Sequence, residues 1–212
     1  MTLRVALVDT GHANLRSVQK ALELAGRELQ GEVVIERTHA PERVRALDKI
    51  VVPGQGGFGD CVRALRGGLD EVIAERVAAG TPYFGICLGL QALFESSEEA
   101  PGVVGLGLLP GHVRRLQAAP GLKIPHMGWN ELELAHGGHP VLSSAGGQGA
   151  WFYFVHSFHA VPADETVIKA RAGYGPNAVT AAVARDNILA TQFHPEKSQA
   201  AGHKLLAAFL RM

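Results

Sequence analysis

The sequence predicts a three-layer α/β fold with a central, mostly parallel sheet and antiparallel strands added in the second half. Three observations support it. Short apolar runs alternate with helical periodicity in the first half, and glycine-rich turns follow several of these runs. The second half has successive apolar runs with no long helix between them. Because 212 residues suffice for one sizeable core, we expect a single domain over residues 1–212.

The first half predicts strands and helices in strict alternation. The continuous apolar run at 5–8 is typical of a strand buried on both faces. Asn14 can cap the helix that follows, and Gly26 can close it. Such alternation favours right-handed crossovers and binding chemistry at the carboxyl ends of the strands. The expected strands are 5–8, 33–35, 50–52 and 82–84, and the expected helices are 15–25, 41–47, 60–79 and 89–94.

The second half predicts strands separated by Gly, Pro and Asn, and then a closing amphipathic helix at 202–210. Asp186 and Asn187 form a plausible hairpin turn. The alanine-rich run at 179–184 suits a helix nearly as well as a strand. The expected strands are 105–116, 124–134, 151–160, 167–172, 179–184 and 188–193.

Composition excludes several classes of function. The 20 basic and 20 acidic side chains cancel, so nothing favours binding to nucleic acid or to an anionic membrane. Two cysteines cannot build a disulfide framework at this size, and neither a signal-peptide pattern nor an 18-residue apolar stretch is present. We therefore expect a soluble, cytoplasmic protein.

Cys87 is the candidate nucleophile. It lies in Gly-Ile-Cys-Leu-Gly, directly after an apolar run, where a strand turns sharply into a helix. Gly85 and Gly89 remove the Cβ atoms that would crowd this turn. The N–H groups at the start of the helix should favour the thiolate. Cys61 has no such context and is expected to be a buried core residue.

His194 is the candidate general base. It follows the apolar run that includes Phe193, and Pro195 favours an extended conformation for it. Residues two apart in an extended chain project to the same side, so Glu196 can orient the imidazole and stabilise its charged form. Cys87, His194 and Glu196 then form a Cys-His-Glu triad.

Acyl transfer also needs donors for the oxyanion. The amide of Leu88, which follows the nucleophile, is one. The second could come from the glycine-rich loop at Gly54 and Gln55, where a peptide plane could rotate an N–H towards or away from the site. We hypothesise that such a rotation switches the oxyanion donor on and off.

These motifs resemble class I glutamine amidotransferases, which carry a G-x-C-x-G-x-Q elbow and an F-H-P-E motif in this order. The stretches at 125–130, 153–157 and 193–198 are similar to the glutaminase subunits of imidazole glycerol phosphate synthases, over nearly the whole chain. The resemblance implies a flavodoxin-like fold and hydrolysis of L-glutamine to glutamate through a cysteinyl thioester. It further implies a heterodimer in which ammonia passes to a (β/α)8-barrel cyclase subunit in histidine biosynthesis.

The resemblance also assigns further residues. Gln91, Ser157 and Phe158 match substrate contacts, and Gly54 with Gln55 match the oxyanion loop, although the related subunits commonly carry valine at the position of Gln55. The positions that match the partner interface or the ammonia exit are Asn14, His126, Met127, Trp129, Asn130, Tyr153 and Lys197.

Other features of the sequence could suggest a metal site, a phosphate loop or a different function. The pairs His136/His139 and His156/His159 come without further ligands at metal-binding spacing, so we expect no metal, and no cofactor. A phosphate loop is disfavoured because the Walker lysine is missing. Trp129 suits an interface or a core equally well, and alternation cannot assign which of Tyr153 and Phe154 points inwards. Three rival functions remain: a glutaminase serving another acceptor, a cysteine hydrolase working alone and a binding module with a degenerate triad.

Overall fold

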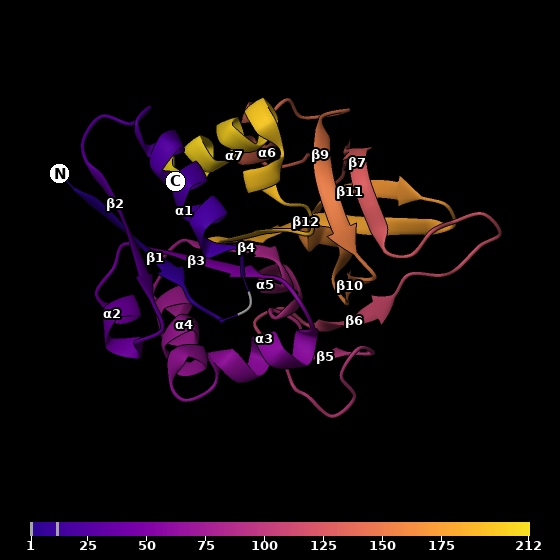
Figure 1. Ribbon diagram of the computed structural model, residues 1–212, viewed down its shortest axis with the longest axis horizontal. Coiled ribbons are helices and arrows are strands. Elements are labelled where there is room, and N and C mark those ends of the chain that lie inside the picture. The colour runs from indigo at the N-terminus through magenta and orange to yellow at the C-terminus, as the bar shows by residue number, and fades with distance from the viewer. Residues whose placement is uncertain (1, 12) are drawn as a thin grey trace.

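The computed structural model describes residues 2–11 and 13–212 and contains a central eight-stranded sheet with helices on both faces (Figure 1). The strand order is β2-β1-β3-β4-β13-β12-β11-β8. The first five strands are parallel, in the order typical of flavodoxin-like sheets, and the last three are antiparallel additions. The predicted fold class is confirmed. The strands are β1 (Leu3–Val8), β2 (Val33–Thr38), β3 (Lys49–Gly54), β4 (Tyr83–Cys87), β8 (Glu133–Leu134), β11 (Ile168–Tyr174), β12 (Asn177–Arg185) and β13 (Ile188–Thr191).

Two hydrophobic cores lie on opposite faces of this sheet. Successive residues of a strand point to opposite faces, so Leu7 joins one core with Phe209, and Val8 joins the other with Val62. The first core is covered by α1 (Leu15–Gly26), α6 (Pro140–Ser144) and α7 (Gln199–Arg211). The second is covered by α2 (Pro41–Arg45), α3 (Phe58–Leu65) and α4 (Leu69–Ala78) (Figure 1).

Two smaller sheets flank the antiparallel side. One has the order β10-β6-β5, and the other pairs β7 with β9. They consist of β5 (Ser96–Ser97), β6 (Gly111–Arg115), β7 (His126–Glu131), β9 (Trp151–His156) and β10 (Phe158–Pro162). Both contribute residues to the site described below.

The helices of the first half differ from the sequence prediction at three places, and glycines explain two of them. The helix expected at 60–79 is two helices, because Gly67 and Gly68 take φ values of 83° and 106°, which break it. Gly26 is not the residue that follows the end of α1, as a terminating glycine would be. It is the last helical residue, where a Cβ would lie 2.8 Å from the Cβ of Val33, so close packing explains it. The helix after Cys87, α5 (Leu88–Gln91), is a single turn rather than a run to residue 94.

Several long strands predicted for the second half are split. The run at 151–160 divides at Ser157 into β9 and β10, which join different sheets. The run at 124–134 similarly becomes β7 and β8, and only the end of 105–116 is a strand. The alanine-rich run is a strand, β12, and it is joined to β13 by a hairpin in which Asp186 has φ 51°. The short strand β5, the helix α6 and the 3₁₀ turn η1 (Glu165–Val167) were not anticipated.

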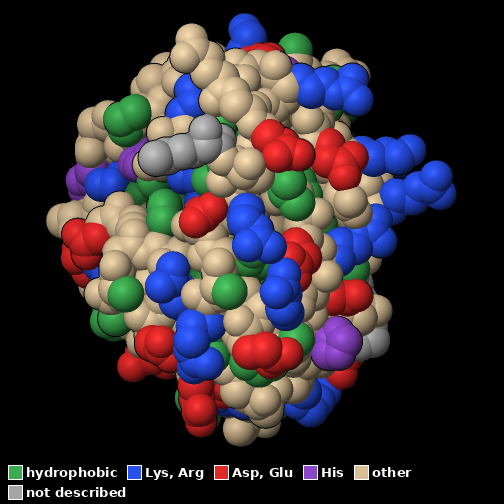
Figure 2. All heavy atoms as spheres, turned by 90° about the vertical axis from the view of Figure 1, so that its left-hand side faces the viewer, with side chains coloured by type: hydrophobic (Ala, Val, Ile, Leu, Met, Phe, Trp, Pro, Cys, Tyr) green, Lys and Arg blue, Asp and Glu red, His purple; other side chains and the backbone are tan. Residues whose placement is uncertain are grey.

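The surface beside β2 and α2 carries interleaved acidic and basic side chains (Figure 2). Arg43 pairs with Glu36 at 2.6 Å, and Arg45 pairs with Glu75 at 2.8 Å. This face therefore has no broad field of one sign to attract a polyanion. Among the residues that the structure describes, no helix combines the length and the apolar character needed to cross a membrane.

Candidate active site

Cys87 ends β4 in a strained conformation, with φ 55° and ψ −101°. The two flanking glycines permit it by allowing close approach of backbone atoms. A Cβ on Gly85 would overlap the carbonyl of Gly89, and a Cβ on Gly89 would overlap the carbonyl oxygen of Val52. The Tyr83 hydroxyl donates a hydrogen bond to the carbonyl oxygen of Gly89 at 2.7 Å and so holds the turn in place. The elbow predicted from the sequence is present.

His194 reaches this elbow because β13 lies directly beside β4, with Thr191 in register with Ile86. The His194 backbone is extended, as Pro195 predicts, but the chain then enters the 3₁₀ turn η2 (Pro195–Lys197). This turn, rather than a continued strand, brings Glu196 back to the imidazole. The His194 Nδ1–H donates to Glu196 Oε1 at 2.8 Å, and both side chains are only 1% exposed.

The second imidazole nitrogen of His194 faces the nucleophile. Nε2 is buried without a hydrogen-bond partner among the described residues, and His194 and Cys87 line the same cavity. Burial lowers the pKa of His194, but the Cys87 thiolate and the Glu196 carboxylate favour the imidazolium more strongly and raise this pKa to about 10. A single helical turn has little dipole, so the imidazolium is the main group that stabilises a thiolate here.

The oxyanion loop lies beside the elbow. Gly54 is the register partner of Cys87, and a Cβ on Gly54 would lie 2.5 Å from the Cβ of Leu88. Any larger residue would therefore push the elbow away. Leu88 opens α5, where helix N–H groups lack intrahelical partners, and Gln55 lines the cavity with it. The arrangement keeps both predicted donors close to Cys87.

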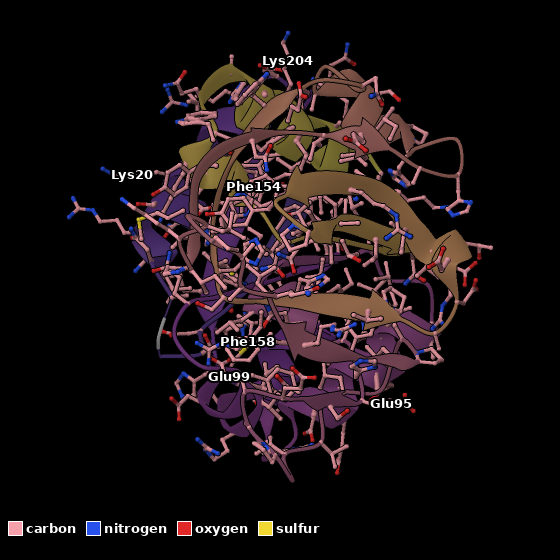
Figure 3. The ribbon with its side chains drawn as sticks, turned by 90° about the vertical axis from the view of Figure 1, so that its right-hand side faces the viewer. Lys20, Glu95, Glu99, Phe154, Phe158 and Lys204 are labelled. Atoms are coloured by element: carbon pink, nitrogen blue, oxygen red, sulfur yellow. The ribbon has the colours of Figure 1, made fainter. Side chains whose placement is uncertain are left out.

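The cavity in front of Cys87 has a volume of about 330 Å³. Gln91, Ser157 and Phe158 line it as expected, and Lys197 does so as well. Glu99, which the sequence did not single out, also borders the cavity, near Phe158 (Figure 3). A space of this volume, lined by both polar and apolar side chains, fits a small amide substrate.

Gln192 is a polar residue of this site that sequence reasoning missed. Its side chain is fully buried, its Nε2 donates to Cys87 Sγ at 3.5 Å, and its Oε1 accepts from Gln91 Nε2 at 3.0 Å. Gln91 Nε2 also donates to the carbonyl of Phe158 at 2.9 Å, while Gln91 Oε1 is buried and unpaired. The signal was available: a glutamine in the otherwise apolar run at 188–193 must be satisfied by specific partners when it is buried.

A pair of buried histidines lies behind the cavity. His156 Nδ1 must carry a proton because it contacts the carbonyl of Phe158 at 2.9 Å, so His156 Nε2 accepts. His126 Nδ1–H donates to it at 2.9 Å, and His126 Nε2 accepts from Asn130 at 3.3 Å. Burial lowers the pKa of His126 to about 4 and that of His156 to about 3, the latter helped by its histidine neighbours. Both rings are therefore neutral.

This pair corrects one expectation for the partner-facing residues. His126 is 2% exposed and stacks on Phe154 and Tyr174, so it points into the protein. On the other side of β7, Met127 is 62% exposed and Trp129 is 42% exposed, which settles Trp129 as a surface residue.

The remaining predicted residues lie at the edge of the site. Phe154 points inwards, whereas Tyr153 is half-buried and packs edge-on against Trp129. The Lys197 ammonium lies 5.8 Å from the Tyr153 ring centroid. Asn14 is exposed, accepts from the Ser17 N–H at 3.3 Å as the predicted cap, and borders a small hollow beside the triad. Within residues 2–11 and 13–212, no three His, Cys, Asp or Glu side chains are grouped to hold a metal ion.

A family model described as glutamine amidotransferase class-I matches residues 7–212. The chain belongs to the class I glutamine amidotransferases. Two solved structures support the fold of this family. A crystal structure of a glutamine amidotransferase matches with a TM-score of 0.69 at 21% identity, covering 98% of this chain and 99% of that chain. The structure of PurLQS from Thermotoga maritima matches with a TM-score of 0.73 at 22% identity, covering 100% and 99%.

Curated relatives within the glutamine amidotransferases are more similar in sequence. The imidazole glycerol phosphate synthase subunit HisH of Nitrosococcus oceani is 48% identical, over 97% of this chain and 96% of the relative. The subunits HisH of Methylococcus capsulatus and Synechococcus elongatus are 46% and 45% identical, covering 98% and 99% of this chain and 95% and 93% of the relatives.

Proposed function

We propose that this chain is the glutaminase subunit of an imidazole glycerol phosphate synthase, and that it supplies ammonia to a (β/α)8-barrel cyclase subunit in a heterodimer. Two kinds of support converge. The chain is similar over nearly its full length to HisH subunits. The observation that carries the chemistry is His194, which contacts Glu196 through one ring nitrogen and faces the Cys87 cavity with the other.

The first half-reaction forms a thioester. The Cys87 thiolate attacks the side-chain amide carbon of L-glutamine, and the N–H of Leu88 with one from the Gly54–Gln55 peptide binds the oxyanion. The C–N bond then breaks as His194 donates its Nε2 proton to the departing nitrogen, which leaves as ammonia. Glu196 keeps the imidazole in the required tautomer throughout.

The second half-reaction releases glutamate. Neutral His194 accepts a proton from water, the resulting hydroxide adds to the thioester carbon, and the C–S bond breaks to restore the thiolate. The product ionises to glutamate and gives a second proton to solvent. Gln91 contacts the substrate, and its unpaired Oε1 offers an acceptor for an N–H donor of the ligand. Gln192 holds Gln91 and the thiol in register.

We place the cyclase subunit against the exposed side of β7, which carries Met127 and Trp129 with Tyr153 and Lys197 beside them. Exposed aromatic and methionine side chains next to a cavity mouth are typical of protein interfaces. Ammonia would then leave near Lys197, which lines the cavity. Because Cys61 and Cys87 are both free thiols, we assign the protein to the reducing cytoplasm.

The rival functions make different predictions. A cysteine hydrolase working alone would turn over glutamine or peptides rapidly without a partner. A glutaminase for another acceptor would fail to support synthesis of imidazole glycerol phosphate. Similarity to HisH subunits of several bacteria favours the cyclase as acceptor.

The test uses the chain copurified with the cyclase subunit encoded in the same organism. Cys87→Ala should abolish synthesis driven by glutamine and preserve synthesis driven by added ammonium salt, because only the ammonia source is lost. The matched control is Cys61→Ala, which removes the other thiol, buried in α3. Loss of both activities in Cys87→Ala, with the complex intact, would refute the assignment.

A further inference from the structure

A second cavity lies on the other side of β10 from the Cys87 cavity. Phe158 lines the Cys87 cavity, whereas the next residue of the strand, His159, lines the second one, because successive side chains of a strand alternate. This second space has a volume of about 230 Å³ and is walled by β6, β10, β11 and β12. Figure 3 views the molecule from the side of this second cavity. We call this second cavity the arginine cavity.

Two strand pairs supply its polar lining. In the small sheet His159 is the register partner of Arg114, and in the central sheet Arg171 is the register partner of Thr180. Side chains of register partners project to the same face, so each pair presents its two polar groups together. Arg115 points the other way, because it follows Arg114 in β6 and its guanidinium lies over the Phe158 ring at 5.9 Å. Two arginines, Arg114 and Arg171, thus share one concave space.

Few acidic groups balance these charges. Within the described residues no ion pair within 4 Å involves the Arg114 guanidinium, although the Glu98 carboxylate is close enough to act on His159. Glu165 is the one acidic residue in the lining, 3.3 Å from Arg171, but its side chain is 71% exposed. An exposed pair of this kind is weak and easily opened. The cavity therefore keeps an excess of positive charge.

His159 gives the second, independent sign of a missing ligand. The residue is only 8% exposed, and its Nδ1 is fully buried without a hydrogen-bond partner among the described residues. Burial and then Arg114 and Arg171 lower the pKa of His159 to about 4, so the ring is neutral. A buried polar side chain beside two guanidinium groups is costly unless something in the cavity accepts hydrogen bonds and carries negative charge.

We propose that the arginine cavity is a binding site for a phosphate group, held by Arg114, Arg171, His159 and the hydroxyl of Thr180. Guanidinium groups bind phosphate oxygens bidentately, and a tetrahedral dianion can accept from all four side chains. The volume of about 230 Å³ exceeds the space of several waters, at about 30 Å³ each, and so admits a phosphate group. This site is separate from glutamine hydrolysis and does not depend on the function proposed above.

The test is titration of the full chain with inorganic phosphate, and separately with glycerol 3-phosphate, at constant ionic strength. Calorimetry and the ring-proton NMR signals of the histidines are the readouts. We expect saturable one-site binding, with the His159 signals shifting at the calorimetric midpoint. Arg114→Gln and Arg171→Gln should each weaken binding about tenfold or more, because each removes charge-assisted hydrogen bonds. Equal affinity for both probes indicates free phosphate as the natural ligand, and tighter glycerol 3-phosphate binding indicates a phosphate monoester.

The matched control is Arg63→Gln. Arg63 is an exposed arginine of α3 that pairs with Asp60, and it does not line the arginine cavity. It should leave the affinity unchanged. The proposal is overturned if neither probe binds saturably, if Arg63→Gln weakens binding as much as the cavity variants, or if binding leaves the His159 signals in place. Thermal unfolding of each variant verifies that it is folded during the titration.

Discussion

His126 Nδ1 donates a hydrogen bond to His156 Nε2 across 2.9 Å of buried space, although both residues are of the kind that usually titrates near neutral pH. The pair is the middle of a directed chain that runs from Asn130 to the carbonyl of Phe158, and that carbonyl also holds Gln91. The direction of each bond requires both imidazoles to be neutral. A proton added to His156 Nε2 would face another N–H.

The first prediction concerns the pH dependence of stability. The unfolded histidines take up protons below about pH 6.5, whereas the folded protein excludes them until about pH 4 for His126 and about pH 3 for His156. The unfolded state therefore binds more protons in this window, and the free energy of unfolding falls with falling pH by about 1.4 kcal/mol per unit for each proton. Urea unfolding at several pH values measures the slope. His126→Phe should flatten it, whereas the exposed control His39→Gln should not; equal slopes in all three proteins would contradict the neutral pair.

The second prediction concerns the charge state of the triad. The pKa of His194 is raised to about 10, so the imidazolium beside Cys87 persists through neutral pH and its contribution to stability, present below pH 6.5, is lost as pH rises through about 10. At pH 7, alkylation of Cys87 by iodoacetamide should be at least about tenfold slower in His194→Asn, because the thiolate loses its counterion. An unchanged rate at pH 7 would show that another group activates Cys87.

The third prediction separates the base from the residue that orients it. Glu196→Gln keeps the shape of the site, so it should lose less activity than His194→Asn does. We expect its turnover with glutamine to remain about a hundredfold higher than that of His194→Asn, because removal of the orienting carboxylate costs less than removal of the base in other triads. Single-turnover release of ammonia by the complex measures both. Equal losses would mean that Glu196 does more than hold the imidazole.

The fourth prediction concerns the elbow glycines. A Cβ on Gly89 would overlap the carbonyl of Val52, so Gly89→Ala should destabilise the protein by about 1–3 kcal/mol and abolish activity. The matched control is Gly173→Ala in β11, where a Cβ meets nothing within 4 Å and φ is not positive. It should be neutral or slightly stabilising. Chemical denaturation compares the two, and similar stabilities would argue that the elbow can relax.

The fifth prediction tests the partner face. Met127→Glu places a charge on the exposed side of β7 and should reduce copurification of the cyclase subunit by tenfold or more, at about 1.4 kcal/mol for each factor of ten. Val104→Glu is the control, because Val104 is equally exposed, at 62%, but lies outside this face. Retention of the cyclase by the Met127 variant would move the interface elsewhere.

Local sequence signals were sufficient for much of this fold. The buried runs around Val5 and Ile50 became parallel strands in the expected order, and the elbow glycines had the predicted steric role. Predictions were wrong where the deciding interaction is tertiary. Nothing local in the run at 151–160 says that β9 and β10 pair with different strands, or that Val33 requires a glycine at position 26.

The site was predicted in part for the same reason. Sequence motifs predicted Cys87, His194 and Glu196 as site residues, because each lies in a recognisable local motif. Gln192 belongs to no such motif: its place in an apolar run indicates that it needs partners, but which partners follows only from the meeting of β13 with β4. His126 was expected among the residues of the partner interface or ammonia exit, but strand alternation places it in the interior and leaves Met127 outside.

The position of β13 has a consequence for the newly made chain. Gln192, two residues before the base, follows Cys87 by 105 positions, yet β13, which ends at Thr191 just before it, is inserted between β4 and β12 at the middle of the sheet. At about 5–20 residues per second, the ribosome exposes the thiol several seconds before the imidazole. A nascent chain therefore carries the nucleophile without its base, and glutamine stays intact until translation has supplied the last strand.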